Sequence, residues 1–219
     1  MGKVKSGVIG KVTGSVGPVV FSVVNGQQVV KEQPTKSTKA ATQSQIDVRE
    51  IFRLTTEAMN NFADVINTGY RIHKQASTPV NTAVKYHIKN AITGISPDFA
   101  LDFTKVRLSN GAEDQDNEVQ VKAADAGAIM NITWSPDVSG SLKNRDLRNT
   151  DLACIVFYHI AKGRYISSIG EVKRGTGKLD MKVPNSFAGT PMHAWIFFAS
   201  EDGTKSFRSE YLNTHTAKL

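Results

Sequence analysis

Between Lys39 and Gly69, apolar and small residues recur at steps of three and four, the spacing of one face of an α-helix. Thr42 followed by Gln45 is a capping-box sequence, and Gly69 is placed to end the helix. We therefore predict one continuous helix over residues 42–67, roughly 35–40 Å long, as the element around which the chain is organised. Its apolar stripe consists of Val48, Ile51, Phe52, Thr55, Ala58, Met59, Phe62, Val65 and Ile66.

A second, shorter helix is expected over residues 79–94. Pro79 suits the first turn of a helix, and Gly94 is placed to end it. The polar residues 70–78 would connect the two helices, which can pack as antiparallel neighbours. The apolar face of the second helix consists of Val80, Ala83, Val84, Ile88, Ala91 and Ile92.

From about Phe99 onward the hydrophobic pattern alternates, as in β-strands. Short alternating runs separated by Asn-Gly, Ser-Pro and Asp-Gly predict an antiparallel β-sandwich that resembles a fibronectin type III or immunoglobulin-like domain. Its core is expected to include Trp134, Tyr158, Trp195 and Phe197. The run WIFFA at residues 195–199 is apolar on both faces, which predicts a central strand or one covered by the helices. The predicted strands span residues 103–108, 118–123, 128–134, 153–159, 165–171, 177–183, 193–200 and 207–212.

The first 33 residues form a glycine-punctuated arm. VVFSVV, Asn25-Gly26 and QQVV together predict a β-hairpin closed by a type I′ turn, and residues 34–39 are a polar linker. The predicted fold class is α+β, with an N-terminal β-hairpin arm, two α-helices and a C-terminal antiparallel β-sandwich. We expect residues 1–98 to contain the arm and the helices, and residues 99–219 to form the sandwich domain.

The net charge of +7 is concentrated in the arm. Residues 1–41 contain six lysines and one glutamate, a balance of +5, so the other 178 residues carry about +2. Such an arm could contact nucleic acid, an anionic surface or an acidic protein partner. An alternative explanation of the same charge is that the lysines keep an exposed edge strand soluble. The lysines have no accompanying arginine, and Phe21 is the one aromatic residue of the arm, so base stacking has little support.

No secretory signal and no membrane-spanning segment are visible in the sequence, and we expect a cytoplasmic or virion location. Cys154 is the one cysteine, so no disulfide can form within the chain, and a buried thiol is expected.

Candidate catalytic, cofactor-binding and metal-binding residues are not found, and we expect a protein that is not an enzyme. The glycine series GVIGKVTGSVG fits neither a Walker A loop nor a dinucleotide-binding fingerprint. The acidic run 113–116 lacks the spacing of a calcium loop and is expected to be a solvated turn. Cys154 and His159 are too far apart along a strand to pair as nucleophile and base. The histidines, which share no ligand spacing, are His73, His87, His159, His193 and His215.

Several motifs together resemble an uncharacterised domain-of-unknown-function family of Bacteroidota, with bacteriophage members also expected. They are the opening G-x-x-G-K-x-x-G-x-x-G, A-T-x-x-Q with Arg49 and Phe52, N-x-A-x-x-Y-x-I-x-N-A-I-x-G over residues 81–94, KVRLSNG at 105–111, and WIFFASEDG with Ser206, Ser209, Tyr211 and Leu212. The resemblance implies a helix-plus-sandwich architecture and a bacterial or bacteriophage source. It implies no catalytic residues and no cofactor.

The sequence thus favours a structural or assembly protein, most specifically a bacteriophage neck, ring or tail component that acts through protein–protein contacts, as a homo-oligomer or within a larger assembly. The alternative is a nucleic-acid-binding protein that uses the basic arm. We expect the arm to be an intermolecular contact element, because a lone hairpin is marginal in water and its edges invite pairing. Alternatively, the arm folds back within one subunit and covers Ile51, Phe52, Met59 and Phe62.

Overall fold

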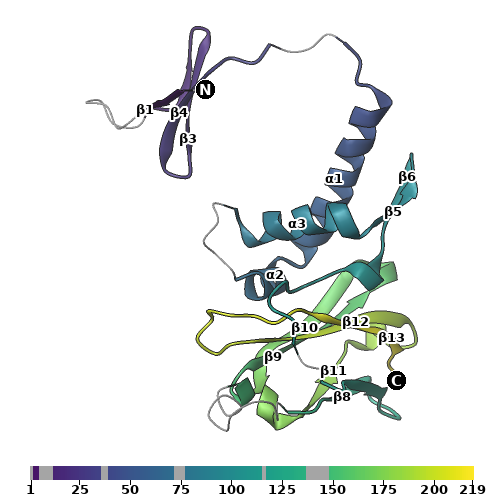
Figure 1. Cartoon of the computed structure of the whole chain (residues 1–219). Coiled ribbons are helices and arrows are strands. Elements are labelled where there is room, and N and C mark those ends of the chain that lie inside the picture. The colour runs from purple at the N-terminus through teal and green to yellow at the C-terminus, as the bar shows by residue number, and fades with distance from the viewer. Residues whose placement is uncertain (1, 5–11, 36–38, 72–76, 115–116, 137–147) are drawn as a thin grey trace. The chain divides into compact units, whose positions relative to one another are not determined.

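The computed structural model describes residues 2–4, 12–35, 39–71, 77–114, 117–136 and 148–219 (Figure 1). It divides into two compact units, Met1–Gln45 and Ile46–Leu219. The two units are described separately below.

The first unit is a four-stranded antiparallel sheet with the strand order β1-β4-β3-β2. The predicted hairpin is confirmed as β3 and β4. Asn25 and Gly26, which join them, have φ angles of +48° and +77°, as a type I′ turn requires. Two short strands extend the hairpin at its two edges. The strands are β1 (Gly2–Val4), β2 (Gly14–Val16), β3 (Val19–Val24) and β4 (Gln27–Glu32).

In the described residues, three helices precede the sandwich instead of the two predicted, and the first of them begins just before the second unit. They are α1 (Gln43–Asn61), α2 (Ala63–Gly69) and α3 (Pro79–Asn90). The predicted long helix is interrupted at Phe62, whose φ and ψ are −99° and 20°. There the Phe62 N–H bonds to the carbonyl of Met59, three residues back, instead of four. The apolar stripe continues through the break, so the hydrophobic period alone could not reveal it.

The predicted starts of the helices are confirmed. The Gln45 N–H donates to Thr42 Oγ1 at 3.4 Å, and the Thr42 N–H donates to Gln45 Oε1 at 3.2 Å. Pro79 occupies the first turn of α3, and Thr78 Oγ1 caps this helix by accepting from the Asn81 N–H.

The predicted end of the second helix at Gly94 is wrong, because α3 ends at Asn90. Gly94 lies instead in a hairpin of β5 (Ile92–Ile95) and β6 (Asp98–Leu101). Its φ of +91° favours glycine, and a Cβ there would lie 2.1 Å from the carbonyl oxygen of Asp98.

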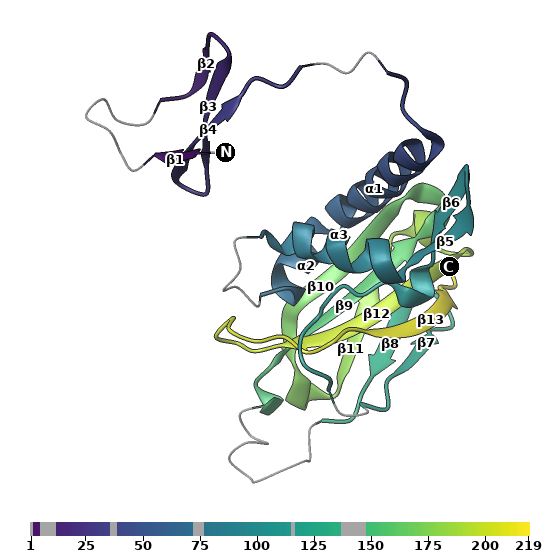
Figure 2. The ribbon, with the colours of Figure 1, turned by 45° about the horizontal axis from the view of Figure 1, so that its top comes forward.

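A seven-stranded antiparallel β-sandwich follows, with a four-stranded sheet β10-β9-β12-β13 and a three-stranded sheet β11-β8-β7 (Figure 2). Along the chain, the first, second and fifth strands form one sheet, and the third, fourth, sixth and seventh form the other. This is the arrangement of a fibronectin type III domain, and the predicted fold class is confirmed. The strands are β7 (Gln120–Ala123), β8 (Ile129–Thr133), β9 (Leu152–His159), β10 (Arg164–Lys173), β11 (Lys178–Lys182), β12 (Pro191–Ala199) and β13 (Glu210–Thr216).

The strand predicted over residues 103–108 is wrong. Phe103–Lys105 forms a 3-10 helix, and the following extended residues bond to side chains instead of a neighbouring strand. The carbonyl of Val106 accepts from Trp195 Nε1 at 3.1 Å, and the Leu108 N–H donates to Ser209 Oγ at 2.9 Å.

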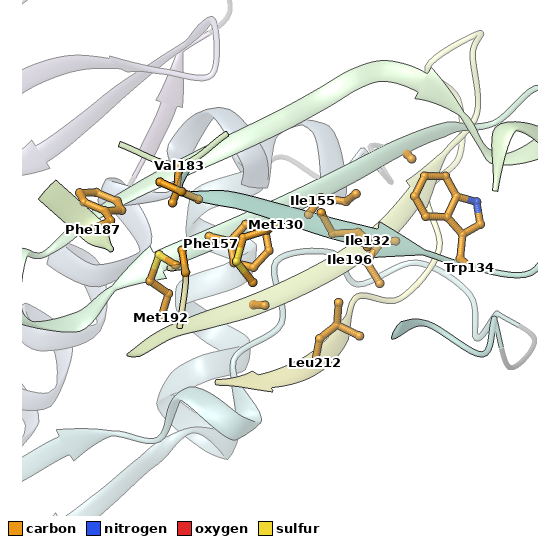
Figure 3. Close-up of a cluster of buried hydrophobic side chains, with 14 of the residues drawn as sticks. Met130, Ile132, Trp134, Ile155, Phe157, Val183, Phe187, Met192, Ile196 and Leu212 are labelled. Carbon is orange, nitrogen blue, oxygen red and sulfur yellow. The ribbon is translucent and has the colours of Figure 1, made fainter. Parts of the chain in front are cut away.

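Two hydrophobic cores lie on opposite faces of the four-stranded sheet. The inner core fills the space between the two sheets and contains Trp134, Ile155, Phe157 and Ile196 (Figure 3). Phe198 belongs to the same core. The outer core lies between the four-stranded sheet and the helices, which cover its other face (Figures 1 and 2).

The predicted sandwich core was therefore only partly right. Trp134 belongs to the inner core, but Tyr158, Trp195 and Phe197 belong to or pack against the outer core. Alternate side chains of a strand point to opposite faces of the sheet. In β12, Ile196 and Phe198 therefore face the sandwich interior, and Trp195 and Phe197 face the helices. The run 195–199 is both central and covered by helices, as predicted.

The helices share the outer core with the four-stranded sheet, so they belong to the same compact unit as the sandwich. The observed division after Gln45 consequently differs from the expected one after residue 98. Met59 and Phe62 are buried in this core.

Gly69 ties the helical layer to the end of the sandwich. Its carbonyl oxygen accepts from Ser206 Oγ at 2.6 Å and from Ser109 Oγ at 2.8 Å, and all three residues are buried. A Cβ on Gly69 would lie 2.2 Å from the carbonyl oxygen of Leu108. This close approach explains the requirement for glycine at a position that the sequence marked only as a helix end.

Phe62→Ala tests the outer core. Phe62 is 1% exposed and packs against Tyr158, Tyr165 and Trp195, with ring centroids 5.2 to 6.2 Å apart. We expect the substitution to lower the free energy of unfolding by about 3–5 kcal/mol, measured by urea denaturation. Phe52→Ala in α1 is the matched control, because Phe52 is 55% exposed, and it should change stability by less than about 0.5 kcal/mol. Equal effects of the two substitutions would contradict the burial of Phe62 in the outer core.

Candidate functional site

His87 is a structural histidine in the hydrophobic interior. Its Nδ1 lies 2.7 Å from the carbonyl oxygen of Ala83, and its Nε2 accepts from the Arg107 N–H at 3.0 Å. This pair of partners fixes a neutral ring with the proton on Nδ1. Burial lowers the pKa of His87 to about 4, because desolvation disfavours the charged form. The side chain therefore holds the start of the 107–109 segment against α3 and has no free ring nitrogen for a metal or a substrate.

His193 lies in an aromatic cluster at the edge of the outer core. Its ring stacks on Phe103 with centroids 4.7 Å apart, and its Nδ1 lies 2.7 Å from the hydroxyl of Tyr211. Desolvation by burial lowers the pKa of His193, and the Asp102 carboxylate opposes this shift. The cluster is a packing arrangement of rings, and Asp102 is already bonded to Thr104 and Lys105.

Cys154 and His159 lie on opposite faces of β9, as their odd spacing requires. Cys154 is buried in the outer core, where desolvation raises the pKa of its thiol to about 12. His159 packs against Phe187, which belongs to the inner core, and its Nε2 lies 2.6 Å from Thr190 Oγ1. The sequence-based conclusion that they do not form a nucleophile–base pair agrees with this geometry.

The acidic run 113–116 differs from the expected solvated turn at Asp114, whose side chain is only 7% exposed. Asp114 accepts from Arg174 Nη2 at 2.8 Å and also pairs with Arg148. Residues 115 and 116 lie outside the described residues.

Arg174 is the charged residue that sequence reasoning missed. Its side chain is completely buried, and its guanidinium carbon lies 4.3 Å from the centroid of the Phe198 ring. The Arg174 carbonyl accepts from Trp134 Nε1 at 2.7 Å. Neighbouring sequence gives no signal for this burial, because the partner residues come from distant strands and loops. Arg174 and Asp114 form a buried ion pair at one end of the sandwich, and removal of either partner would leave the other charge buried and uncompensated.

The remaining histidines are His215 and His73. His215 Nε2 lies 2.5 Å from the carbonyl oxygen of Leu212, and His73 lies outside the described residues. Within the described ranges, no group of three or more His, Cys, Asp or Glu side chains could hold a metal ion. No helix in those ranges is long and apolar enough to cross a membrane.

Exposed apolar side chains in each unit are the candidate interaction surfaces. In the first unit, Val16, Val23 and Val24 are 64%, 37% and 52% exposed. Gln28 and Val29 are the fully buried residues of its described part, and the Gln28 side chain bonds to the backbone of Val12.

In the second unit, the N-terminal half of α1 leaves Val48 and Phe52 exposed, by 63% and 55%. Phe52 borders a hollow of about 420 Å³ whose other lining residues come from α3, among them Val84, Lys85 and Ile88. The apolar stripe of the predicted long helix is thus covered by the sandwich in its second half and left open in its first half.

The pH dependence of stability tests the assignment of His87. Its pKa is about 4 when folded and 6.5 in the absence of the protein environment, so the unfolded chain binds more protons between these values. Stability should therefore fall as the pH decreases from 6.5 to 4, by on the order of 3 kcal/mol at most from this residue. His87→Gln, which keeps a donor and an acceptor but does not titrate, should flatten this slope in urea unfolding curves. An unchanged slope would assign the pH dependence to other groups.

The solved structures that resemble this chain include two with low sequence identity. The fn3 domain of human collagen alpha-1(XX) chain is 10% identical with a TM-score of 0.36, over 51% of this chain and 91% of that domain. The chicken interferon gamma receptor alpha chain is 8% identical with a TM-score of 0.37, over 58% of this chain and 64% of the receptor chain. No curated protein sequence matches the chain. The sandwich topology is therefore assigned from the strand order itself.

The motif resemblance predicted membership in an uncharacterised domain family, and this prediction is confirmed. Residues 10–213, which are most of the chain, match a single family description. The chain belongs to DUF6266, a family of unknown function.

Proposed function

We propose that this protein is a non-enzymatic structural subunit that acts through protein–protein contacts made by its N-terminal sheet. The observation that supports this proposal most directly is the incomplete burial of that sheet. It contains the valine-rich strands β3 and β4, yet its described part buries only Gln28 and Val29.

Size explains why such a sheet needs a partner. The first unit, Met1–Gln45, is close to the size of about 40 residues below which disulfides, metals or association are usually needed for folding. The first unit has no cysteine, since Cys154 lies in the second unit. Contact with another protein would cover the exposed valines and supply the missing burial.

The exposed half of α1 provides a second contact surface. Val48 and Phe52 follow the spacing i, i+4 and lie on one side of the helix. Two exposed apolar surfaces on one chain suit a subunit that has more than one neighbour in an assembly.

A more specific form of this proposal is that the assembly is a bacteriophage virion, as we expected from the sequence. Virion neck, ring and tail components are repeated subunits, and a segment completed by its neighbours suits that arrangement. Mass spectrometry of purified particles from a strain that carries the gene tests it: the protein should be present in stoichiometric amounts in the particles. Its absence from particles, with the protein present in the cell lysate, would overturn the virion setting and leave the assembly role unaffected.

Nucleic-acid binding by the arm is the alternative function, and the arm's balance of +5 favours it. Phosphate contacts by lysines would make such binding strongly dependent on salt. A gel-shift series from about 50 to about 200 mM salt with double- and single-stranded DNA should show no retardation if the arm serves protein contacts. Retardation at low salt that is lost at high salt would favour the alternative.

Deletion of residues 2–33 tests the assembly role. The second unit contains both hydrophobic cores, so the truncated chain should keep a cooperative unfolding transition. It should also elute as a monomer at concentrations where the full chain associates, as measured by light scattering after size exclusion. A truncated chain that unfolds would place the sheet within the monomer's own core. A truncated chain that associates like the full chain would remove the sheet from the assembly role.

A further inference from the structure

We infer that β2 is an open sheet edge that pairs, antiparallel, with β2 of a second copy of this chain. This inference rests on the proposed function and names the partner of the N-terminal sheet. The argument depends on the contrast between β2 and the edge strands of the sandwich and of its own sheet.

The sandwich protects its edges in the ways that prevent edge-to-edge association. β11 alternates Lys178, Asp180 and Lys182, all exposed, and β7 carries Lys122 in the middle of a four-residue strand. Charged side chains along an edge oppose pairing with another strand.

The edges of the four-stranded sheet are irregular as well. β10 shifts register between Ile169 and Lys173, where Gly170 has a φ of +76°. β12 and β13 shift register between His193 and Trp195, and Asn213 in β13 has a φ of +65°. Such irregularities twist an edge and interrupt its ladder of backbone groups.

Within the N-terminal sheet the two edges differ. β1 has Lys3 at its middle position, whereas β2 consists of Gly14, Ser15 and Val16. It carries no charge and no proline, and all three residues are exposed. In the described part of the chain β2 pairs with β3 alone.

Hairpin geometry defines which backbone groups of β2 face outward. Val16 pairs with Val19 across the two-residue turn Gly17-Pro18, so these two residues form the hydrogen-bonded pair next to the turn. Ser15, opposite Val20, then belongs to the next, non-hydrogen-bonded pair. Its N–H and C=O point away from β3 and toward the open edge.

The edge is complementary to itself. In an antiparallel pair centred on Ser15, the two Ser15 residues face each other and exchange two backbone hydrogen bonds. Val16 of each copy then lies opposite Gly14 of the other, so neither large side chains nor like charges oppose each other. The result is a two-fold symmetric dimer with an eight-stranded sheet, the commonest symmetry of soluble oligomers.

Sedimentation velocity of the full chain tests the pairing, with Val16→Lys and Ser15→Pro as the disrupting variants. Val16→Lys adds a charge at the edge, and Ser15→Pro removes the outward N–H at a position where an edge strand accepts proline. We expect each variant to raise the dimer dissociation constant at least about tenfold.

Gln27→Lys is the matched control. It introduces the same charge at an exposed residue of β4, opposite Val24 and next to the Asn25-Gly26 turn, outside the β2 edge. It should leave the dissociation constant within about twofold of the wild-type value. Amide hydrogen exchange of the β3–β4 ladder should be unchanged in all three variants, which shows that the sheet itself remains folded.

Salt separates this pairing from a charge-driven contact. Because both arms are basic, salt screens their repulsion, and the dimer should be as tight or tighter at about 500 mM than at about 50 mM NaCl. A monomeric wild-type chain at about 100 µM, well above usual dimer affinities, would overturn the inference. Equal weakening by Gln27→Lys, or no weakening by either edge variant, would also overturn it.

Failure of this inference is distinguishable from failure of the proposed function. If deletion of residues 2–33 abolishes association but the edge variants do not weaken it, the sheet is a contact element and β2 is not the paired edge. If the deleted chain associates as the full chain does, the proposed function itself is wrong.

Discussion

The second unit depends on a sheet that is buried on both of its faces. Strand β12 sends alternate side chains into two different hydrophobic cores, with Ile196 and Phe198 on one side and Trp195 and Phe197 on the other. An antiparallel sheet usually leaves one face to water, and its strands then alternate apolar and polar residues. Here the helices occupy the second face, so the strand must be apolar throughout, and the helical layer and the sandwich form one cooperative structure.

The two units therefore differ in the source of their stability. The larger unit completes its burial internally and holds the helices to the sheet through Gly69, Ser109 and Ser206. The N-terminal sheet has regular turns and a defined register but little burial of its own.

The sequence was sufficient for features that local rules govern. The capping box of Thr42 and Gln45, the type I′ turn at Asn25-Gly26 and seven strands of alternating pattern are all present in the structure.

Features that depend on distant residues were not predictable in this way. The break at Phe62 lies inside an uninterrupted apolar stripe. Residues 106–108 have a strand-like pattern but bond to the side chains of Trp195 and Ser209, which lie far along the chain. Trp195 was predicted to lie in the sandwich core but lies in the outer core. The pattern of β12 does not show which of its two apolar faces points to the sandwich interior, because the helices cover the other face. Burial of Arg174 likewise requires Asp114 and Asn117 from another part of the chain.

The position of the helices before the sandwich in the chain has a consequence for biosynthesis. Phe62 leaves the ribosome roughly 130 residues before Trp195, which at typical elongation rates is on the order of 10 s. During that interval the apolar face formed by Met59, Phe62, Val65 and Ile66 has no sheet to cover it. This apolar face therefore remains uncovered, and accessible to chaperones and to other nascent chains, until β12 has been synthesised. Native folding of this unit is consequently delayed until nearly the whole chain is available, and crowded translation of the same message is the setting in which its misassembly is most favoured.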